Sequence, residues 1–227
     1  SGGGRLVIQS ELEPLPGLAT GITRGINWIE FAAAHNLAVG DVVIVYNPVD
    51  FSFSLARAYY RDGAMFRVSK VESATKVTFY GVSPVQLDVL AATGPDVPML
   101  CYRMSGGEVV IDNLSIIPPE GGASINIVGH QSVKIGRVLH RQHAGTHASP
   151  TGVQISRCYD VDIDGFRPRA MSTSSGDAYP LNIANSQNVR IKGGSFYSNW
   201  HCIALGGTGA VGCVPCREIV IDHATLM

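Results

Sequence analysis

Three aspartates at alternate positions are the residues best suited to chemistry. In the segment "YDVDIDG", Asp160, Asp162 and Asp164 alternate with the apolar residues Val161 and Ile163. If this segment is a strand whose apolar residues point inward, the carboxylates share its outward face, with neighbours about 6.5–7 Å apart. Inverting glycosidases separate their acid and base by a similar distance, so Asp162 and Asp164 are the candidate catalytic pair. The same row could instead hold Ca²⁺, or be a solvated strand face that discourages edge pairing.

A second candidate is an aromatic segment suited to binding sugar rings. The run "FYSNWHCIALGG" (196–207) places Tyr197, Trp200 and His201 in a polar return between two apolar patterns. Aromatic side chains offer large amphipathic faces, which suit the weakly polar faces of sugars. The alternative is that Trp200 covers the end of a hydrophobic core.

A histidine-rich segment, "HRQHAGTHASP" (140–150), carries three histidines beside Arg141. The spacing resembles a zinc cluster, but no helix is expected to align the imidazoles and no carboxylate lies nearby. We therefore expect Arg141 to contact glycan hydroxyls or a neighbouring subunit, and we predict no metal here.

The five cysteines include one C-x-x-C motif, Cys213 and Cys216, close in sequence to Cys202. A metal or disulfide site can be drawn from these residues and their neighbouring histidines, but a second C-x-x-C is missing. Packing inside turns is the prediction that we favour. The sequence also has no G-x-S-x-G, Walker loop or dinucleotide fingerprint, so we predict no cofactor apart from the Ca²⁺ left open above.

The candidate residues lie on a sequence repeat. The phrases "VKIGRV", "VDIDGF" and "VRIKGG" begin at residues 133, 161 and 189, so their starts are 28 residues apart. "VVIDNL" at 109–114 and the row that begins at Ile219 extend the series, and each row has a second apolar pair upstream. These pairs are Ile125/Ile127, Val153/Ile155, Leu181/Ile183 and Ile203/Leu205, with Leu100/Tyr102 as the candidate pair for the first row.

Two short strands per row, with inward residues at every second position, predict an all-β solenoid. No row buries its apolar side alone, but stacked rows share one continuous core. His130, Cys158, Ser186 and Cys216 each lie three residues before the phrase, where a small or polar corner residue fits. In this arrangement Asp112 and Asp222 share the column of Asp164 and either extend an acidic stripe or are simply exposed. A β-sandwich is the alternative fold, although sandwiches seldom keep both strand positions in phase over four rows.

The segments "NSQNVRIKGGSF" and "RCYDVDIDGF" resemble the coils of right-handed parallel β-helices of the pectate-lyase-like class. The resemblance is closest to bacteriophage tailspikes and tail fibres and covers roughly residues 100–227, within the β-helix rungs that we assign to residues 99–227. It implies a homotrimer in the virion tail, outside the host cell, that contacts other tail proteins and binds cell-surface polysaccharide. Many members of the class also depolymerise that polysaccharide by hydrolysis or β-elimination.

The first hundred residues lack the repeat. Residues 28–98 alternate apolar and polar residues between Gly- and Asp-containing turns, which predicts a small β-rich module. Residues 1–27 are assigned to a linker, although "RLVIQS" at 5–10 fits an earlier rung, in which case the module interrupts the β-helix. The chain ends within a strand-like pattern, so we expect a piece of a longer protein with more rungs beyond residue 227.

Composition and charge narrow the classes of partner. The formal net charge is −1 and the pI is near 6.6, which argues against a nucleic-acid partner. The longest apolar runs are too short to cross a bilayer, so we expect no membrane insertion. Three functions stay open: a tailspike that binds and depolymerises polysaccharide, a receptor-binding or structural fibre segment without activity, and a secreted bacterial polysaccharide lyase or epimerase.

Overall fold

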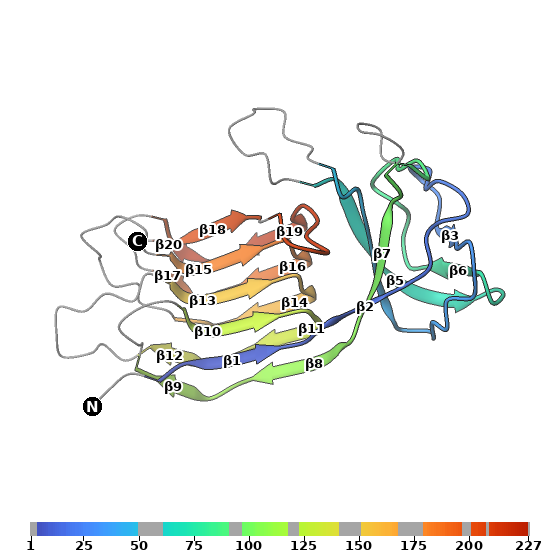
Figure 1. Cartoon of the computed structure of the whole chain (residues 1–227). Helices are drawn as coiled ribbons and strands as arrows, with labels where there is room; N and C mark the ends of the chain where they lie inside the picture. The colour runs from blue at the N-terminus through green and yellow to red at the C-terminus, as the bar shows by residue number, and fades with distance from the viewer. Residues whose placement is uncertain are drawn as a thin grey trace. The chain divides into compact units, whose positions relative to one another are not determined.

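A computed structural model of the chain describes residues 4–49, 61–90, 97–117, 123–140, 151–167, 179–196, 201–207 and 209–226. Every regular element in these ranges is a β-strand (Figure 1). The described residues contain no helix with the length and apolar character needed to span a membrane.

The chain folds into two compact units. The coil contains residues 1–10, 106–206 and 216–227, and the module contains residues 11–105 and 207–215. The module therefore begins before the predicted residue 28 and continues past the predicted residue 98. The reason is that strands at both ends of the segment pair with the module's own sheet, as described below.

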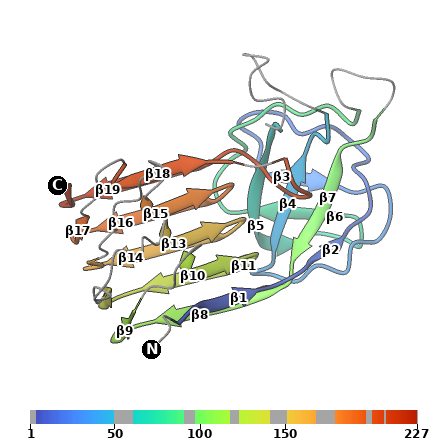
Figure 2. The ribbon, with the colours of Figure 1, turned by 60° about the vertical axis from the view of Figure 1, so that its left-hand side comes forward.

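The coil has two long parallel sheets whose strands alternate along the chain (Figure 2). Sheet 1 consists of β1 (Leu6–Gln9), β10 (Ala123–Val128), β13 (Thr151–Ser156), β15 (Tyr179–Ala184) and β18 (Ile203–Gly206). Sheet 2 consists of β8 (Gly106–Ile111), β11 (His130–Ile135), β14 (Tyr159–Asp164), β16 (Gln187–Lys192) and β19 (Arg217–Asp222). Two short parallel pairs follow sheet 2: β9 (Leu114–Ile116) with β12 (Val138–His140), and β17 (Ser195–Phe196) with β20 (Thr225–Leu226).

The strand register confirms the predicted stack. Val133 pairs with Val161, and Val161 pairs with Val189, so the repeated phrase forms one column across sheet 2. These three residues are at most 1% exposed, and the isoleucines two positions later are equally buried. Because period-2 alternation turns both columns inward on every rung, the rungs share one hydrophobic core.

The first rung is split by the module. Leu6 and Ile8 of β1 pair with Ile125 and Ile127, so β1 supplies the sheet 1 strand of this rung. The prediction that Leu100 and Tyr102 fill this place is wrong, because both residues lie on the module strand β7 (Leu100–Met104). An antiparallel module strand and a coil strand have the same local alternation, so the sequence pattern alone does not distinguish them.

The corners between sheet 1 and sheet 2 use backbone conformations with positive φ. Gly129, Arg157 and Asn185 have φ values of 77°, 52° and 52° at equivalent positions in successive rungs. The residue that follows each of them is buried at the corner, and the hydroxyl of Ser186 accepts a hydrogen bond from the Cys158 N–H at 3.1 Å. These corners reverse the chain within two residues, which keeps consecutive strands on the same rung.

The chain has two glycines after β16, Gly193 and Gly194, where β14 is followed by the single Gly165. The second glycine changes the corner beyond sheet 2. Gly194 has a φ of 89°, and a Cβ there would lie 2.4 Å from the carbonyl oxygen of Phe166 on the rung below. Only glycine fits this close approach. Phe196 lies further from the end of β16 than Phe166 lies from the end of β14. Phe196 is nevertheless fully buried, and its ring meets Phe166 edge-to-face, with centroids 6.0 Å apart.

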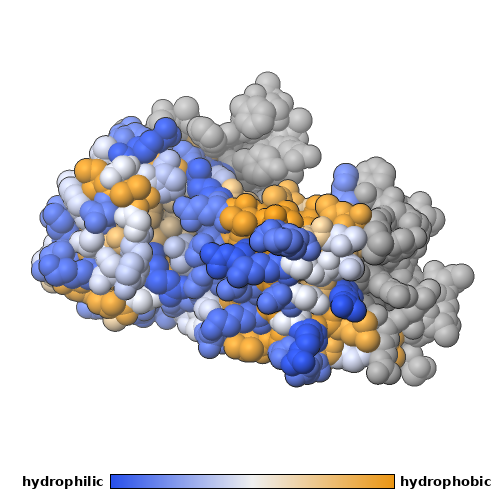
Figure 3. All heavy atoms as spheres, turned by 180° about the vertical axis from the view of Figure 1, so that it is seen from behind, coloured by the Kyte–Doolittle hydropathy of each residue, from blue (hydrophilic) through white to orange (hydrophobic). Residues whose placement is uncertain are grey.

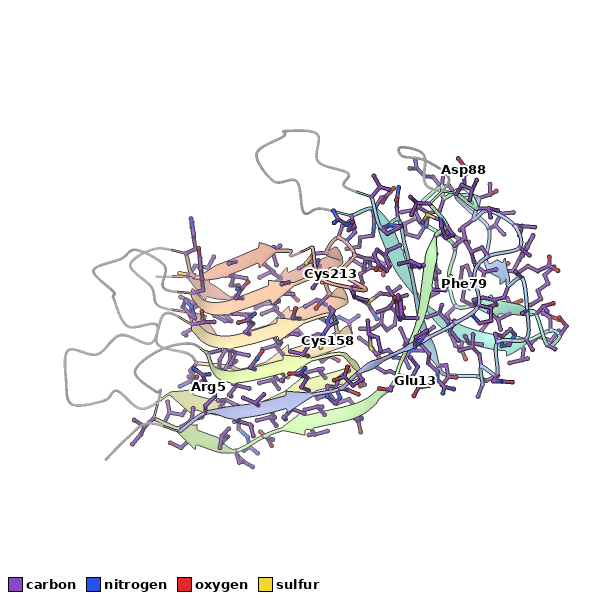
Figure 4. The ribbon with its side chains drawn as sticks, viewed as in Figure 1. Arg5, Glu13, Phe79, Asp88, Cys158 and Cys213 are labelled. Carbon is purple, nitrogen blue, oxygen red and sulfur yellow. The ribbon has the colours of Figure 1, made fainter. Side chains whose placement is uncertain are left out.

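The module is a six-stranded antiparallel sheet with its own core. Its strand order is β2 (Leu12–Pro14), β7, β4 (Val42–Tyr46), β5 (Gly63–Val71), β6 (Lys76–Phe79) and β3 (Trp28–Glu30). Phe66 and Phe79 stack at 4.3 Å between ring centroids, and Phe79 is labelled in Figure 4. Because β2 and β7 are paired at its edge, the module extends from residue 11 to residue 105.

The segment between β18 and β19 belongs to the module. Residues 207–215 leave the coil between β18 and β19, which is the type of corner at which the module departs between β1 and β8. Cys213 and Val214 are at most 1% exposed, and the backbone of Gly212 hydrogen-bonds the Tyr46 hydroxyl. The loop is therefore buried through apolar side chains and grouped with the module.

Candidate functional site

The outward face of sheet 2 carries the predicted catalytic pair. Asp162 and Asp164 both point away from the coil core on β14, as the alternation requires. In register, Asp162 lies between Lys134 and Arg190, and its Oδ1 is 3.9 Å from a guanidinium nitrogen of Arg190. Both side chains of this pair are about half exposed, so solvent screens the contact.

The neighbouring charges on sheet 2 also alternate in sign. Lys134 Nζ lies 2.5 Å from Glu108 Oε1; this hydrogen bond lowers the pKa of Glu108 and raises that of Lys134. Figure 3, which views the molecule from the side opposite to Figure 1, shows hydrophilic and hydrophobic atoms interspersed on this side. The outward column of sheet 2 consists of Val110, Lys134, Asp162, Arg190 and Val220. Its two end residues, Val110 and Val220, are apolar and are 61% and 53% exposed. This pattern is typical of a solvated strand face.

The predicted acidic stripe is interrupted. Asp164 pairs in register with Lys192, and Lys192 pairs with Asp222, so a cation separates the two carboxylates. Immediately after β8, Asp112 accepts hydrogen bonds from the guanidinium and the backbone N–H of Arg137, which lower its pKa. The break is set by Lys192, which occupies the same column on the rung between Asp164 and Asp222.

The described residues contain no group of three or more His, Cys, Asp or Glu side chains that could hold a metal ion. Asp160 accepts a hydrogen bond from the Asn188 amide at 3.0 Å, which directs this carboxylate toward the adjacent rung. The row Asp160, Asp162, Asp164 is therefore not gathered around one point, as a Ca²⁺ ion would require.

Cys158 and Cys216 pack in corners of the coil, as the sequence predicts. Cys158 is fully buried, and its thiol contacts the carbonyl oxygen of Ser156 at 3.3 Å. Two rungs further along the coil, the Cys216 thiol makes the equivalent contact with the carbonyl oxygen of Gly206, also at 3.3 Å. None of the five cysteines forms a disulfide bond, and Cys213 and Cys216 lie in different units of the structure.

We expect Cys158 to resist alkylation in the folded protein. Burial raises the pKa of its thiol to about 11, so at pH 8 almost none of the reactive thiolate forms, and the fraction rises only as the pH approaches that value. Iodoacetamide at pH 8 followed by peptide mass spectrometry should label half-buried Cys202 first and Cys158 only after urea is added. Equal labelling rates in the native state would contradict the buried corner.

Of the residues predicted to bind glycan, the structure places His201. It is exposed immediately before β18, and its ring stacks on Tyr179 with centroids 6.0 Å apart and planes 5° apart. Tyr179 begins β15 on the rung below. Arg141, Tyr197 and Trp200 lie outside the described residues, and their roles stay predictions.

Sheet 1 presents a column that the sequence analysis missed. Asn126, Gln154 and Asn182 occupy the outward middle position of three consecutive strands and pair in register. All three are partly buried. The signal was visible as the polar residue between the two apolar residues of each upstream pair, but single amides at alternate positions are ordinary in strands.

Known proteins with similar sequence and fold identify the family of this architecture. The model of the family described as Gp49, pectin lyase-like, matches residues 145–227. The tailspike gp61 of Pseudomonas phage phi297 superposes with a TM-score of 0.85 at 33% identity over 97% of this chain. The chain is a pectate-lyase-like β-helix of the phage tailspike class. Two further tailspike structures have the same fold as this tailspike β-helix.

These two are gp49 of Pseudomonas phage LKA1, with a TM-score of 0.82 and 28% identity over 96% of the chain, and Gp54 of Acinetobacter baumannii bacteriophage AP22. The latter, solved in complex with A. baumannii capsular saccharide, has a TM-score of 0.73 and 24% identity over 97% of the chain, which shows a shared fold. The tailspike β-helix spans 35% of the length of each of these three structures. No curated protein matches the sequence.

Proposed function

We propose that this β-helix is part of a phage tailspike that binds bacterial cell-surface polysaccharide during adsorption. The observation that carries the proposal is the 33% identity to the phi297 tailspike over 97% of the chain, module and coil together. The AP22 tailspike, which shares this fold, was solved in complex with a capsular saccharide. Stacked rungs also suit an extended polymer, because they repeat the same outward positions at about 4.8 Å intervals.

Binding is tested by retention of the full chain on immobilised, purified polysaccharides. Since two of the similar tailspikes come from Pseudomonas phages, the panel contains Pseudomonas O-polysaccharides, with Acinetobacter capsule as a second set. Specific retention on one polysaccharide supports the proposal. Absence of retention on every member of the panel would contradict it.

Depolymerisation is the second part of the proposal, with Asp162 and Asp164 as acid and base. If the pair acts, Asp162→Asn and Asp164→Asn each reduce release of reducing ends or unsaturated products about 10²-fold or more. Asp160→Asn is the matched control, because Asn tolerates the φ of 56° at this position and the side chain lies on the same strand. Unchanged rates in both variants would place the chemistry elsewhere.

Two alternative functions give different results in these assays. A receptor-binding or structural fibre segment binds polysaccharide and releases no product. A secreted lyase or epimerase works as a monomer and loses activity on chelation of Ca²⁺. We propose a homotrimer in contact with other tail proteins, so light scattering of the assembled protein separates the tailspike from the monomeric enzyme.

A further inference from the structure

The amide column on sheet 1 differs from the rest of the outward surface of the coil. Asn126, Gln154 and Asn182 give one primary amide per rung on three successive rungs. The column continues with the apolar residues Val7 below and Ala204 above. It carries no formal charge, whereas the equivalent column of sheet 2 alternates between cations and anions.

The hydrogen-bonding groups of these amides are not used within the described structure. None of the three side chains has a hydrogen-bond partner there, and the Oδ1 atom of Asn126 is fully buried without one. A buried acceptor without a partner destabilises the fold by the desolvation of that group. In contrast, the polar side chains of sheet 2 are joined by contacts such as Asn188 to Asp160 and Lys134 to Glu108. Gln154 and Asn182 are partly exposed, so their amide groups are open to a ligand that supplies both donors and acceptors.

The chemistry and spacing of the column fit a hydroxyl-rich polymer. Each amide offers two donors and an acceptor with two lone pairs, which match sugar hydroxyls in either direction. The rungs repeat at about 4.8 Å, close to the length of one pyranose residue in an extended chain. A polysaccharide that runs along the coil axis would thus meet one amide per sugar.

An aromatic pair lies on the same sheet at the start of the strands. Tyr179 and His201 stack one rung above the other, and Thr151 pairs in register with Tyr179 on the rung below. Their amphipathic rings and the threonine hydroxyl continue the uncharged polar character of the amide column.

We propose that the amide column Asn126–Gln154–Asn182, with Tyr179 and His201 beside it, is the surface that binds the polysaccharide. The inference rests on the proposed function and specifies where and how the polymer is recognised. It assigns the main binding contacts to neutral hydrogen bonds on sheet 1; the carboxylate pair proposed for cleavage lies on sheet 2 and is not part of this surface. The ligand is consequently a hydroxyl-rich segment whose recognition does not depend on charge.

The test compares two double variants of the full chain on the Pseudomonas O-polysaccharide panel. Gln154→Ala/Asn182→Ala should weaken binding about tenfold or more, because it removes two hydrogen-bonding groups. The matched control, Val110→Ala/Val220→Ala, truncates two exposed outward residues of sheet 2 that lie outside the proposed catalytic pair, and it should bind like wild type. Binding should also change little between 50 and 300 mM salt. Asn182→Ser, a milder change, serves if the double variant does not fold, as judged by its thermal transition.

The outcomes separate the two proposals. Undiminished binding by a folded Gln154→Ala/Asn182→Ala variant overturns the amide column and leaves the proposed function intact. A wild-type chain that binds no polysaccharide in the panel overturns both. If the variant loses binding together with a change of oligomeric state by light scattering, the column is a subunit interface and the inference is wrong.

Discussion

Val161→Asp should abolish the cooperative unfolding transition of the coil, or lower its free energy of unfolding by several kcal/mol. Val161 is 1% exposed and lies in the middle of the column between Val133 and Val189. A carboxylate there is buried without a cation or hydrogen-bond donor, which costs several kcal/mol of a total stability of about 5–15 kcal/mol. Because each rung contacts only its neighbours, a defect in a central rung disrupts packing on both sides.

The same substitution at an outward position is the control. Val110→Asp changes a side chain that is 61% exposed on the same sheet, so its unfolding midpoint should match wild type. Urea titrations followed by far-UV circular dichroism measure both. The effect of Val161→Asp should lessen as the pH falls, because burial raises the pKa of the new carboxyl and protonation removes its charge. Equal midpoints for the two variants would show that Val161 is not inside a stacked coil.

Phe166→Ala should reduce the free energy of unfolding by about 3–5 kcal/mol. Phe166 is fully buried, and its edge-to-face contact with Phe196 closes the core beyond sheet 2 on two adjacent rungs. Removing the ring leaves a cavity that the fixed corner at Gly194 prevents from collapsing, since backbone atoms of both rungs meet there. The measurement is again urea unfolding, with Leu139→Ala, a half-exposed side chain of the same coil, as the low-cost comparison.

A double-mutant cycle tests the pairing itself. Phe196→Ala alone should be similarly destabilising, and the two changes together should cost less than their sum by about 0.5–1.5 kcal/mol. Strict additivity would mean that the rings do not contact each other. In that case the corner at Gly193 and Gly194 would not bring Phe196 into line with Phe166 on the adjacent rung.

The sequence by itself determined the repeating part of the fold. The 28-residue spacing of the Val-x-Ile phrase set the vertical columns, and alternation identified Val133, Val161 and Val189 as inward residues. It also identified the corner residues such as Cys158, because a tight reversal accepts only small or polar side chains there. These features are local and periodic, and stacking of like rungs converts a period in the sequence directly into neighbours in space.

Only the tertiary structure decided which distant segments join the stack. β1 completes the first rung with a partner more than one hundred residues away, and residues 207–215 pack into the module rather than the coil. The sequence placed Asp162 and Asp164 outward, but the cations beside them and the unsatisfied amides of sheet 1 became evident only from strand register. Alternation states which face a residue takes and leaves its cross-strand neighbour open, because that neighbour depends on how rungs and insertions are arranged in space.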